Sequence, residues 1–369
     1  MTKTFNFYFP CIEDGGLEKN VFALVNSLAE KKFIINFFTY EDSTRSTKLR
    51  KKFFFNKRIN VITSNFFPNI NNRYLRYFFC FIQLFFFSVS NKGIIVSFQG
   101  NILPIITAKI TGRKIIIRCN TAPSKYINNS FKRLFFKFFY SLSDLILVTS
   151  IDFKKEIKKY FQLNSYVHRQ SLDIKKIQKQ SHTDLKFSFF ENFKGLKIIN
   201  IGRLTHQKDQ MSLLKAFVKL IKYRQARLLI IGDGSDRDML EKFIENNNIG
   251  DLVKIIPYTK NPFKYVKKSN VKVLSSRYEG NPNILLEIAC LKKIIISSDS
   301  KVGPREILQS GKGGFLYKVG KVNKLSKLLR NINVNSKIIK KKVNISYDYI
   351  LKNYQKDISI PFIKLIKNI

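Results

Sequence analysis

The sequence predicts an α/β protein built from two doubly wound domains. Short β-branched runs typical of buried parallel strands alternate with helical patterns, and the alternation restarts after a polar stretch at residues 174–194. The chain has 369 residues, of which 44% are hydrophobic and 35 are Phe. This is enough for two cores and excludes a disordered chain. We therefore expect a first domain over residues 1–180, a second over 190–346, and a helical tail from about 347 to 369 that packs back on the first.

In the first half, strands are expected at residues 4–9, 33–39, 60–63, 94–98, 114–118 and 145–149. A Gly15-Gly16 pair follows the first strand and precedes a helix, where free amides favour anions and glycine lets a ligand approach the backbone. Asn120 follows the strand at 114–118, at the edge where such sheets bind ligands. The alternative role for Asn120 is to cap a turn.

In the second half, strands are expected at residues 197–201, 227–231, 252–256, 271–274 and 293–297, with helices at 210–222, 237–246, 263–268 and 282–291. Arg203 and Lys208 lie in the loop after the first of these strands. A forked guanidinium and a point charge at one sheet edge suit a diphosphate. The alternative is two solvated bases in a chain that is rich in them.

The stretch at residues 276–289 combines two acids with a helix start. Asn281 and Pro282 predict a cap followed by the first helical residue, which places Glu279 just before the helix. Glu287 falls inside the apolar run at 284–291, where a charge is costly unless something binds it. We interpret this stretch as a site for a ligand rich in hydroxyls and phosphates. The alternative is a surface helix with one solvated Glu.

The formal net charge of +42 calls for an anionic partner. Basic and aromatic residues occur together at 48–58 and at 131–140, and in the second segment Lys132, Arg133 and Lys137 share one helix face. This pattern suits a helix lying on an anionic membrane surface. Two alternatives remain open: core helices with a solvated basic face, and a genome biased toward Lys, Asn, Ile and Phe.

Other functional classes find little support. The four Cys and three His have no metal-ligand spacing, so we expect no metal site and buried thiols in a reducing cytoplasm. No phosphate-binding P-loop and no Gly-x-Ser-x-Gly motif occurs. No secretory signal is expected at the start, and the longest apolar stretch, at 77–89, is shorter than a membrane-spanning helix.

Several of these features together resemble the retaining glycosyltransferases of family 4, which have GT-B architecture. The resemblance is carried by Gly202-Arg203 with Lys208, and by Glu279 and Glu287, which have seven residues between them. Supporting stretches lie at residues 15–16, 230–234, 303–308 and 313–316. The resemblance covers most of the chain and is strongest from about 197 to 320. It implies two Rossmann-like doubly wound domains that face each other across a cleft.

The resemblance also implies roles for individual residues. Arg203 and Lys208 would take the diphosphate of a nucleotide sugar, Glu287 the ribose hydroxyls, and Glu279 the donor sugar. Arg203, Lys208 and Glu279 would thus be the catalytic residues. The remaining donor contacts would come from backbone amides near the helix start and from the first domain: Gly280, Asn281, Asn283, Ile284, Gly16 and Asn120. Gln170-Ser171 stands where the family usually has Asn-Pro before the linker, so that hinge contact is not expected here.

The functional hypothesis is a hexosyltransferase that uses a nucleotide sugar, with UDP as the expected nucleotide. Its acceptor would be lipid-linked or a surface polysaccharide, in capsule, O-antigen or lipopolysaccharide biosynthesis. We expect no cofactor or metal, no nucleic acid partner, and a cytoplasmic, peripheral location on the inner face of the cell membrane. Two alternatives are a sugar-nucleotide epimerase of the same architecture, for which no proton-abstracting His is evident, and a basic nucleic-acid-binding protein.

Overall fold

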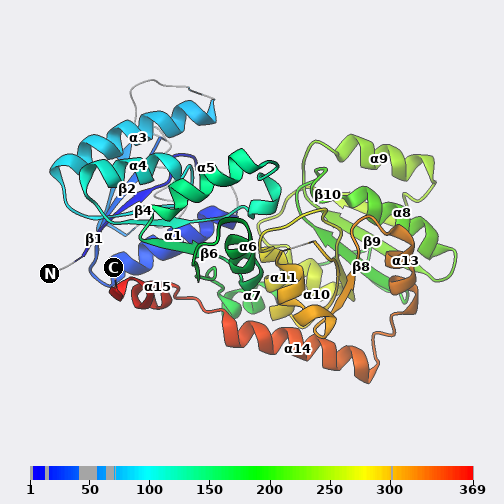
Figure 1. The fold of residues 1–369 in the computed structure, drawn as a ribbon. Helices are drawn as coiled ribbons and strands as arrows, with labels where there is room; N and C mark the ends of the chain where they lie inside the picture. The colour runs from blue at the N-terminus through cyan, green and yellow to red at the C-terminus, as the bar shows by residue number, and fades with distance from the viewer. Residues whose placement is uncertain are drawn as a thin grey trace. The chain divides into compact units, whose positions relative to one another are not determined.

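The structure, a computed structural model, describes residues 3–12, 16–40, 56–63, 70, 72–300 and 302–368. The chain divides into two compact units, each described by itself below (Figure 1). The first unit comprises Met1–Ser171 and Lys356–Ile369, and the second comprises Leu172–Gln355.

The first unit contains a parallel sheet whose described strands follow the order β3-β2-β1-β4-β5-β6-β7. These strands are β1 Thr4–Tyr8, β2 Ile34–Thr39, β3 Ile59–Thr63, β4 Ile94–Ser97, β5 Ile115–Arg118, β6 Leu145–Val148 and β7 Tyr166–Val167. The helices are α1 Gly16–Glu30, α3 Arg73–Ser90, α4 Ile102–Thr111, α5 Ser130–Ser141, α6 Ile151–Phe161 and α15 Ser359–Leu365, with short 3₁₀ turns η1 Pro123–Lys125 and η3 Ile366–Asn368.

The C-terminal helix α15 completes the core of the first unit. Ile358, Phe362 and Ile366 are buried in the same cluster as Phe5 and the apolar face of α1. The rings of Phe5 and Phe362 meet edge to face with centroids 5.8 Å apart. This arrangement places α1 and α15 together on one face of the sheet.

The second unit repeats the architecture, with described strands in the order β10-β9-β8-β11-β12-β13, all parallel. Its strands are β8 Leu196–Ile201, β9 Ala226–Ile231, β10 Val253–Ile256, β11 Val271–Leu274, β12 Ile294–Ser298 and β13 Phe315–Tyr317. Its helices are α7 Ile174–Ser181, α8 Gln210–Ile221, α9 Arg237–Asn246, α10 Phe263–Lys268, α11 Asn283–Cys290, α12 Pro304–Ile307, α13 Val322–Asn331 and α14 Lys337–Asn353, with the 3₁₀ turn η2 Gln309–Gly311.

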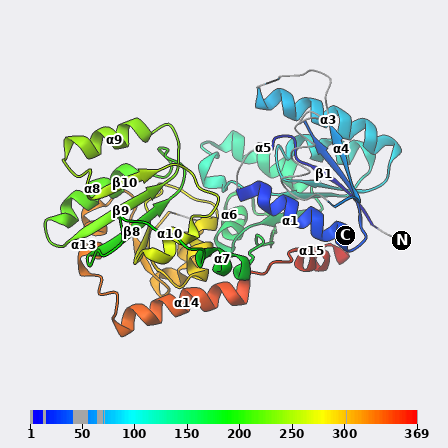
Figure 2. The same ribbon diagram turned by 180° about the vertical axis from the view of Figure 1, so that it is seen from behind.

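Helices cover both faces of this second sheet. One buried cluster joins α8, α9 and α13 to the sheet, and another joins α7, α10, α11 and α14 to the opposite face. Figures 1 and 2 show α8 and α13 on one side of the strands and α10 and α14 on the other. Two doubly wound parallel sheets, as predicted, are therefore confirmed.

The boundaries between the two units differ from the predicted ones. Residues 174–181, expected as part of a polar linker, form α7 and belong to the second unit. Asp173 caps this helix by accepting from the Lys176 amide at 3.0 Å, and Ile177 is buried against its neighbours. Lys and Gln fill the solvated side of α7, so composition hides its short apolar stripe.

The tail also differs from the single helix expected from residue 347. The helix α14 begins at Lys337 and stays with the second unit, and the chain returns to the first unit at Lys356. Asp357 then fixes α15 to α1, since it accepts from Ser27 Oγ at 2.6 Å and pairs with Lys31.

Some of the sequence expectations fall on residues outside the described part of the chain. These residues are Gly15 and, in the basic-aromatic segment at 48–58, residues 48–55. Within the part of the chain that is described, no helix has the length and apolar character needed to cross a membrane.

Candidate functional site

The candidate site lies at the carboxyl edge of the second sheet, where two loops leave neighbouring strands. The strands β8 and β11 pair in parallel, so the loop at residues 202–209 and the loop at 275–282 begin at the same edge. Ligands of doubly wound sheets bind at this edge. Arg203, Lys208 and Glu279, which were predicted as the catalytic residues, all lie on these two loops.

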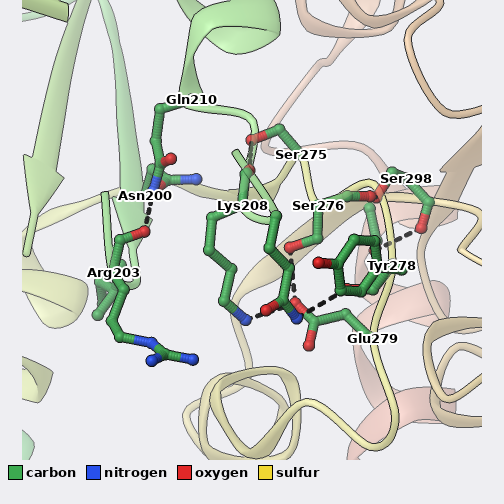
Figure 3. A network of polar contacts seen from close by, with 12 residues as sticks. Asn200, Arg203, Lys208, Gln210, Ser275, Ser276, Tyr278, Glu279 and Ser298 are labelled. Carbon is green, nitrogen blue, oxygen red and sulfur yellow. Dashed lines mark hydrogen bonds and ion pairs between the residues drawn. The ribbon is translucent and has the colours of Figure 1, made fainter. Parts of the chain in front are cut away.

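Lys208 and Glu279 form an ion pair across the two loops (Figure 3). Lys208 Nζ lies 2.6 Å from Glu279 Oε1, and Ser276 Oγ donates to the same oxygen at 2.6 Å. The Glu279 side chain is only 6% exposed. A carboxylate at this depth needs both a counter-charge and hydrogen bonds, and here it has both.

Further hydrogen bonds join the two loops along their length. The Arg277 amide donates to the Gln207 carbonyl at 2.8 Å, and Gln207 Nε2 donates to the Tyr278 carbonyl at 3.1 Å. Ser275 Oγ donates to the carbonyl of Lys208 itself at 2.8 Å. The backbones on either side of the ion pair are therefore fixed to each other, which holds the two charged side chains in place.

Arg203 occupies the outer part of the site. Its side chain is exposed and makes no hydrogen bond or ion pair with the described residues, whereas its carbonyl accepts from buried Gln210 Nε2 at 2.9 Å. Figure 3 shows Arg203 and Lys208 extending in the same direction from their loop. The loop thus presents a guanidinium in solvent beside an ammonium that is held by a carboxylate.

Gly232 and Gly234 let the loop after β9 approach the loop at residues 202–209 closely. A Cβ on Gly232 would lie 2.0 Å from the Gly202 carbonyl oxygen, and one on Gly234 would lie 2.2 Å from that of Leu204. Both glycines also have a positive φ. The loop after β9 therefore supports the backbone on either side of Arg203.

The start of α11 corrects one prediction. The helix begins at Asn283, and Pro282, with an extended ψ of 104°, is the N-cap, so Asn281 is not the cap. Asn281 Nδ2 instead lies 3.4 Å from Tyr354 Oη. Gly303 packs beneath this turn, because a Cβ there would lie 2.8 Å from the Gly280 carbonyl oxygen.

Glu287 lies in the second turn of α11 and is half-buried, while its neighbours Leu286 and Ile288 are fully buried. Burial raises the pKa of Cys290 to about 12, and the negative charge of Glu287 adds to this rise. The donor-binding roles predicted for Gly280, Asn281, Asn283, Ile284 and Glu287 stay predictions, although all five lie at or next to the first turns of α11.

Sequence reasoning missed Lys272, a fully buried lysine in the middle of β11. Its Nζ donates to the Ile201 carbonyl at 3.3 Å. Burial, and next the charge of Lys208, lower the pKa of Lys272 well below its usual value, while Glu279 and Glu287 oppose this shift. A cation inside the apolar run 271–274 was the signal that could have revealed it, by the same argument that singled out Glu287.

Two predicted donor contacts belong to the first unit. The helix α1 begins at Gly16, and Asn120, directly after β5, donates from Nδ2 to the Phe98 carbonyl at 2.7 Å. The approach of Gly16 and Asn120 to the site of the second unit stays a prediction. Among the described residues no three His, Cys, Asp or Glu side chains gather as metal ligands.

Comparisons with known proteins bear on this site. The family described as glycosyl transferases group 1 matches residues 181–347. The chain is 38% identical over 180 residues to an uncharacterized glycosyltransferase of Methanocaldococcus jannaschii, covering 47% of this chain and 44% of the relative. It is 26% identical over 245 residues to a Campylobacter jejuni N-acetylgalactosamine-N,N'-diacetylbacillosaminyl-diphospho-undecaprenol 4-alpha-N-acetylgalactosaminyltransferase, covering 64% and 65%. The matched stretches thus span 44% of the first relative's length and 65% of the second's.

Among solved structures, Anabaena HepE in complex with UDP matches with a TM-score of 0.76 at 13% identity, covering 100% of each chain. At this identity the likeness shows the fold alone, which is GT-B. The sequence match falls on the unit that contains Arg203, Lys208, Glu279 and Glu287. Residues 181–347, which lie within the second unit, are therefore similar to the family of group 1 glycosyl transferases.

Proposed function

We propose that this chain is a retaining glycosyltransferase of family 4 that moves a hexose-type sugar from a UDP-sugar to a lipid-linked or surface-polysaccharide acceptor in glycan biosynthesis. The observation that carries the proposal is the ion pair between Lys208 and buried Glu279. It lies beside exposed Arg203, on two loops that hydrogen bonds join. UDP in the matched HepE structure supports the donor class. The α-linkage and the undecaprenol diphosphate in the name of the Campylobacter relative support retention and a lipid-linked acceptor.

The chemistry follows from the charges at this sheet edge. Sugar transfer expels a nucleoside diphosphate and passes through a cation-like sugar centre. Arg203 and Lys208 would neutralise the departing diphosphate, and Glu279 would face the positive charge that develops on the sugar. Departure and attack on the same face of the sugar would retain the configuration without a protein nucleophile. Glu287 would bind the ribose hydroxyls.

The partners follow from the same proposal. The chain would act without a cofactor or metal and without nucleic acid, as a peripheral protein on the cytoplasmic face of the membrane that holds its acceptor. Lysines and arginines would supply the positive charge that a diphosphate donor and an anionic surface both require. The match to glycosyltransferases favours this proposal over an epimerase or a nucleic-acid-binding protein.

A panel of UDP-sugars tests the proposal through release of UDP and through thermal stabilisation. One donor should give UDP release and raise the melting temperature with its concentration. Arg203→Ala should weaken donor binding and release by about tenfold or more, since a hydrogen bond to a charged group contributes about 1.5–3 kcal/mol. Glu287→Gln should weaken donor binding to a similar extent. Arg330→Ala, which removes an exposed arginine in α13, serves as the control and should change neither.

The alternatives predict other products in the same assay. An epimerase would convert one UDP-sugar into another without free UDP. A nucleic-acid-binding protein would bind nucleic acid with a steep salt dependence and ignore the donors. Absence of release and of stabilisation with every donor, together with unchanged behaviour of Arg203→Ala, would overturn the proposed function.

A further inference from the structure

Three helices of the first unit form a continuous layer over one face of its sheet. The helix α4 packs against α3 on one side and against α5 on the other. Figure 1 shows α3, α4 and α5 on one side of the strands, with α1 and α15 on the other. We call the outer side of these three helices the α3–α5 surface.

The α3–α5 surface is apolar where a soluble protein is normally polar. Cys80, Leu84 and Ser88 form the buried stripe of α3, so the opposite side of this helix should carry polar residues. It instead exposes large apolar side chains, as do α4 and α5. Their exposed fractions are Tyr74 80%, Leu75 45%, Phe78 48%, Phe86 68%, Val89 56%, Ile110 66%, Phe131 76%, Leu134 64%, Phe135 40% and Phe138 61%.

Such exposure is concentrated rather than scattered. Ten of the twenty large hydrophobic side chains that the structure describes as exposed lie on α3, α4 and α5. On α5 the rings of Phe131 and Phe135 stack with centroids 6.4 Å apart, so they form one apolar surface. A contiguous exposed apolar patch marks a surface that binds something.

The charges on the same helices have a single sign. The sequences of α3, α4 and α5 contain no Asp or Glu. They carry six cations: Arg73, Arg76, Lys109, Lys132, Arg133 and Lys137. Lys137 Nζ donates to Gln162 Oε1 and Arg133 Nε to the Tyr160 carbonyl, at 2.9 and 2.7 Å, so neutral oxygens hold these groups while their charge stays uncompensated.

This combination selects the kind of partner. A second copy of the chain, docked by the same face, would bring cations against cations with no carboxylate on these helices to offset them, and would repel. A nucleic acid would satisfy the cations but leave Leu134, Val89 and Ile110 in contact with polar phosphates. An anionic bilayer offers phosphate headgroups to the cations and hydrocarbon to the rings at the same time.

We propose that the α3–α5 surface docks onto the headgroup region of an anionic lipid bilayer, with the side chains of α3 and α5 inserted at the boundary of the hydrocarbon. The proposal rests on the proposed function, because docking would bring the chain to the membrane that holds a lipid-linked acceptor. Its physical basis lies wholly in the first unit, whereas the donor chemistry is argued from the second. The two can therefore fail separately.

Vesicle flotation tests the docking surface. The full chain should bind vesicles that contain phosphatidylglycerol, bind phosphatidylcholine vesicles much less, and dissociate as salt rises. Phe131→Ser with Phe138→Ser should lower binding to the anionic vesicles by about tenfold or more. Lys109→Gln with Lys132→Gln should lower it similarly and reduce the salt dependence.

The control removes exposed apolar residues from elsewhere in the same unit. Ile34→Ser with Ile360→Ser changes side chains that are 51% and 45% exposed, on β2 and α15, and should leave vesicle binding unchanged. All variants should keep the wild-type melting temperature and the same UDP release in vesicle-free solution. The docking surface would be overturned if the wild type failed to bind anionic vesicles, or if the Phe131/Phe138 variant bound them equally well. It would also be overturned if that variant kept vesicle binding but lost self-association of the chain. None of these outcomes would affect the donor proposal.

Discussion

Lys208 and Glu279 are 71 residues apart in the sequence, yet their side-chain atoms Nζ and Oε1 lie 2.6 Å apart. The pair is largely removed from solvent, with side chains 17% and 6% exposed, so neither charge is well screened by water. If one partner is removed, the other charge is free to interact with a ligand. The roles of the two residues can therefore be tested separately by substitution.

Glu279→Gln should impair turnover while leaving binding of UDP equal or tighter. Gln can still accept from Ser276, but it carries no charge to stabilise the sugar cation, so kcat should fall by about 10²–10³-fold. Lys208 loses a competing carboxylate and becomes more available to the diphosphate. Steady-state kinetics and UDP titration measure the two effects, with Glu241→Gln on the surface of α9 as the control. A parallel loss of UDP affinity and kcat would contradict the separate roles.

The sequence predicts the scaffold of this site well because each strand is a short run of β-branched residues bounded by helical periodicity. The strand β9 and the helices α9 and α10 lie within a residue of their expected bounds. The edge positions of Arg203, Lys208 and Glu279 follow from that alternation alone.

Contacts between loops could not be predicted in the same way. The Ser275–Lys208 and Gln207–Tyr278 hydrogen bonds involve backbone carbonyls, whose directions depend on loop conformation rather than residue type. The exposed face of α3 was also missed, because an apolar run at 77–89 has the same composition in a core helix as in an interfacial one.

Gly232→Ala should weaken donor binding through the backbone. The new Cβ would fall 2.0 Å from the Gly202 carbonyl oxygen, which cannot move without displacing Arg203. Overpacking of this kind costs roughly 1–3 kcal/mol of stability, and donor KM should rise by about tenfold as the guanidinium shifts. Gly250→Ala is the matched control, since nothing lies within 4 Å of its Cβ. Wild-type kinetics and melting in Gly232→Ala would disprove the predicted close approach.

Lys272→Met should stabilise the protein at neutral pH. Because the pKa of folded Lys272 lies well below its ordinary value of 10.5, folding must expel a proton or bury a charge. Replacing a buried charge with an apolar side chain of similar size is often stabilising by roughly 1–4 kcal/mol. Above about pH 10.5 the amine is neutral in both states, so the advantage of Met should shrink as the pH rises.

Urea unfolding at pH 7 and pH 9.5 measures this difference. Lys254→Met changes an exposed lysine on β10, another strand of the same sheet, and should show neither the gain nor its pH dependence. A Lys272→Met protein that is less stable than the wild type at pH 7 would instead mean that the hydrogen bond to the Ile201 carbonyl outweighs the burial of the amine.

His168 should make the first unit sensitive to acid. It is fully buried after β7, and its Nε2 lies 2.9 Å from the Ile358 carbonyl oxygen at the start of α15. Burial, and next the charge of Arg118, lower the pKa of His168 to about 4. Since the unfolded value is about 6.5, unfolding takes up a proton between these limits. The unfolding free energy should be unaffected above pH 6.5 and should fall as the pH drops, by roughly 3 kcal/mol once below pH 4.

His168→Gln separates this effect from general acid denaturation, because Gln can donate to the Ile358 carbonyl but does not titrate. Urea unfolding at pH 7 and pH 4.5 should show a smaller acid loss in His168→Gln than in the wild type. His206→Gln, which changes an exposed histidine, should behave as the wild type at both values. If His168→Gln and the wild type lose the same free energy between pH 7 and pH 4.5, the protonation of His168 does not contribute to the acid sensitivity. Asp357, which accepts from Ser27 and from the Ser359 amide, would then be the next group to replace.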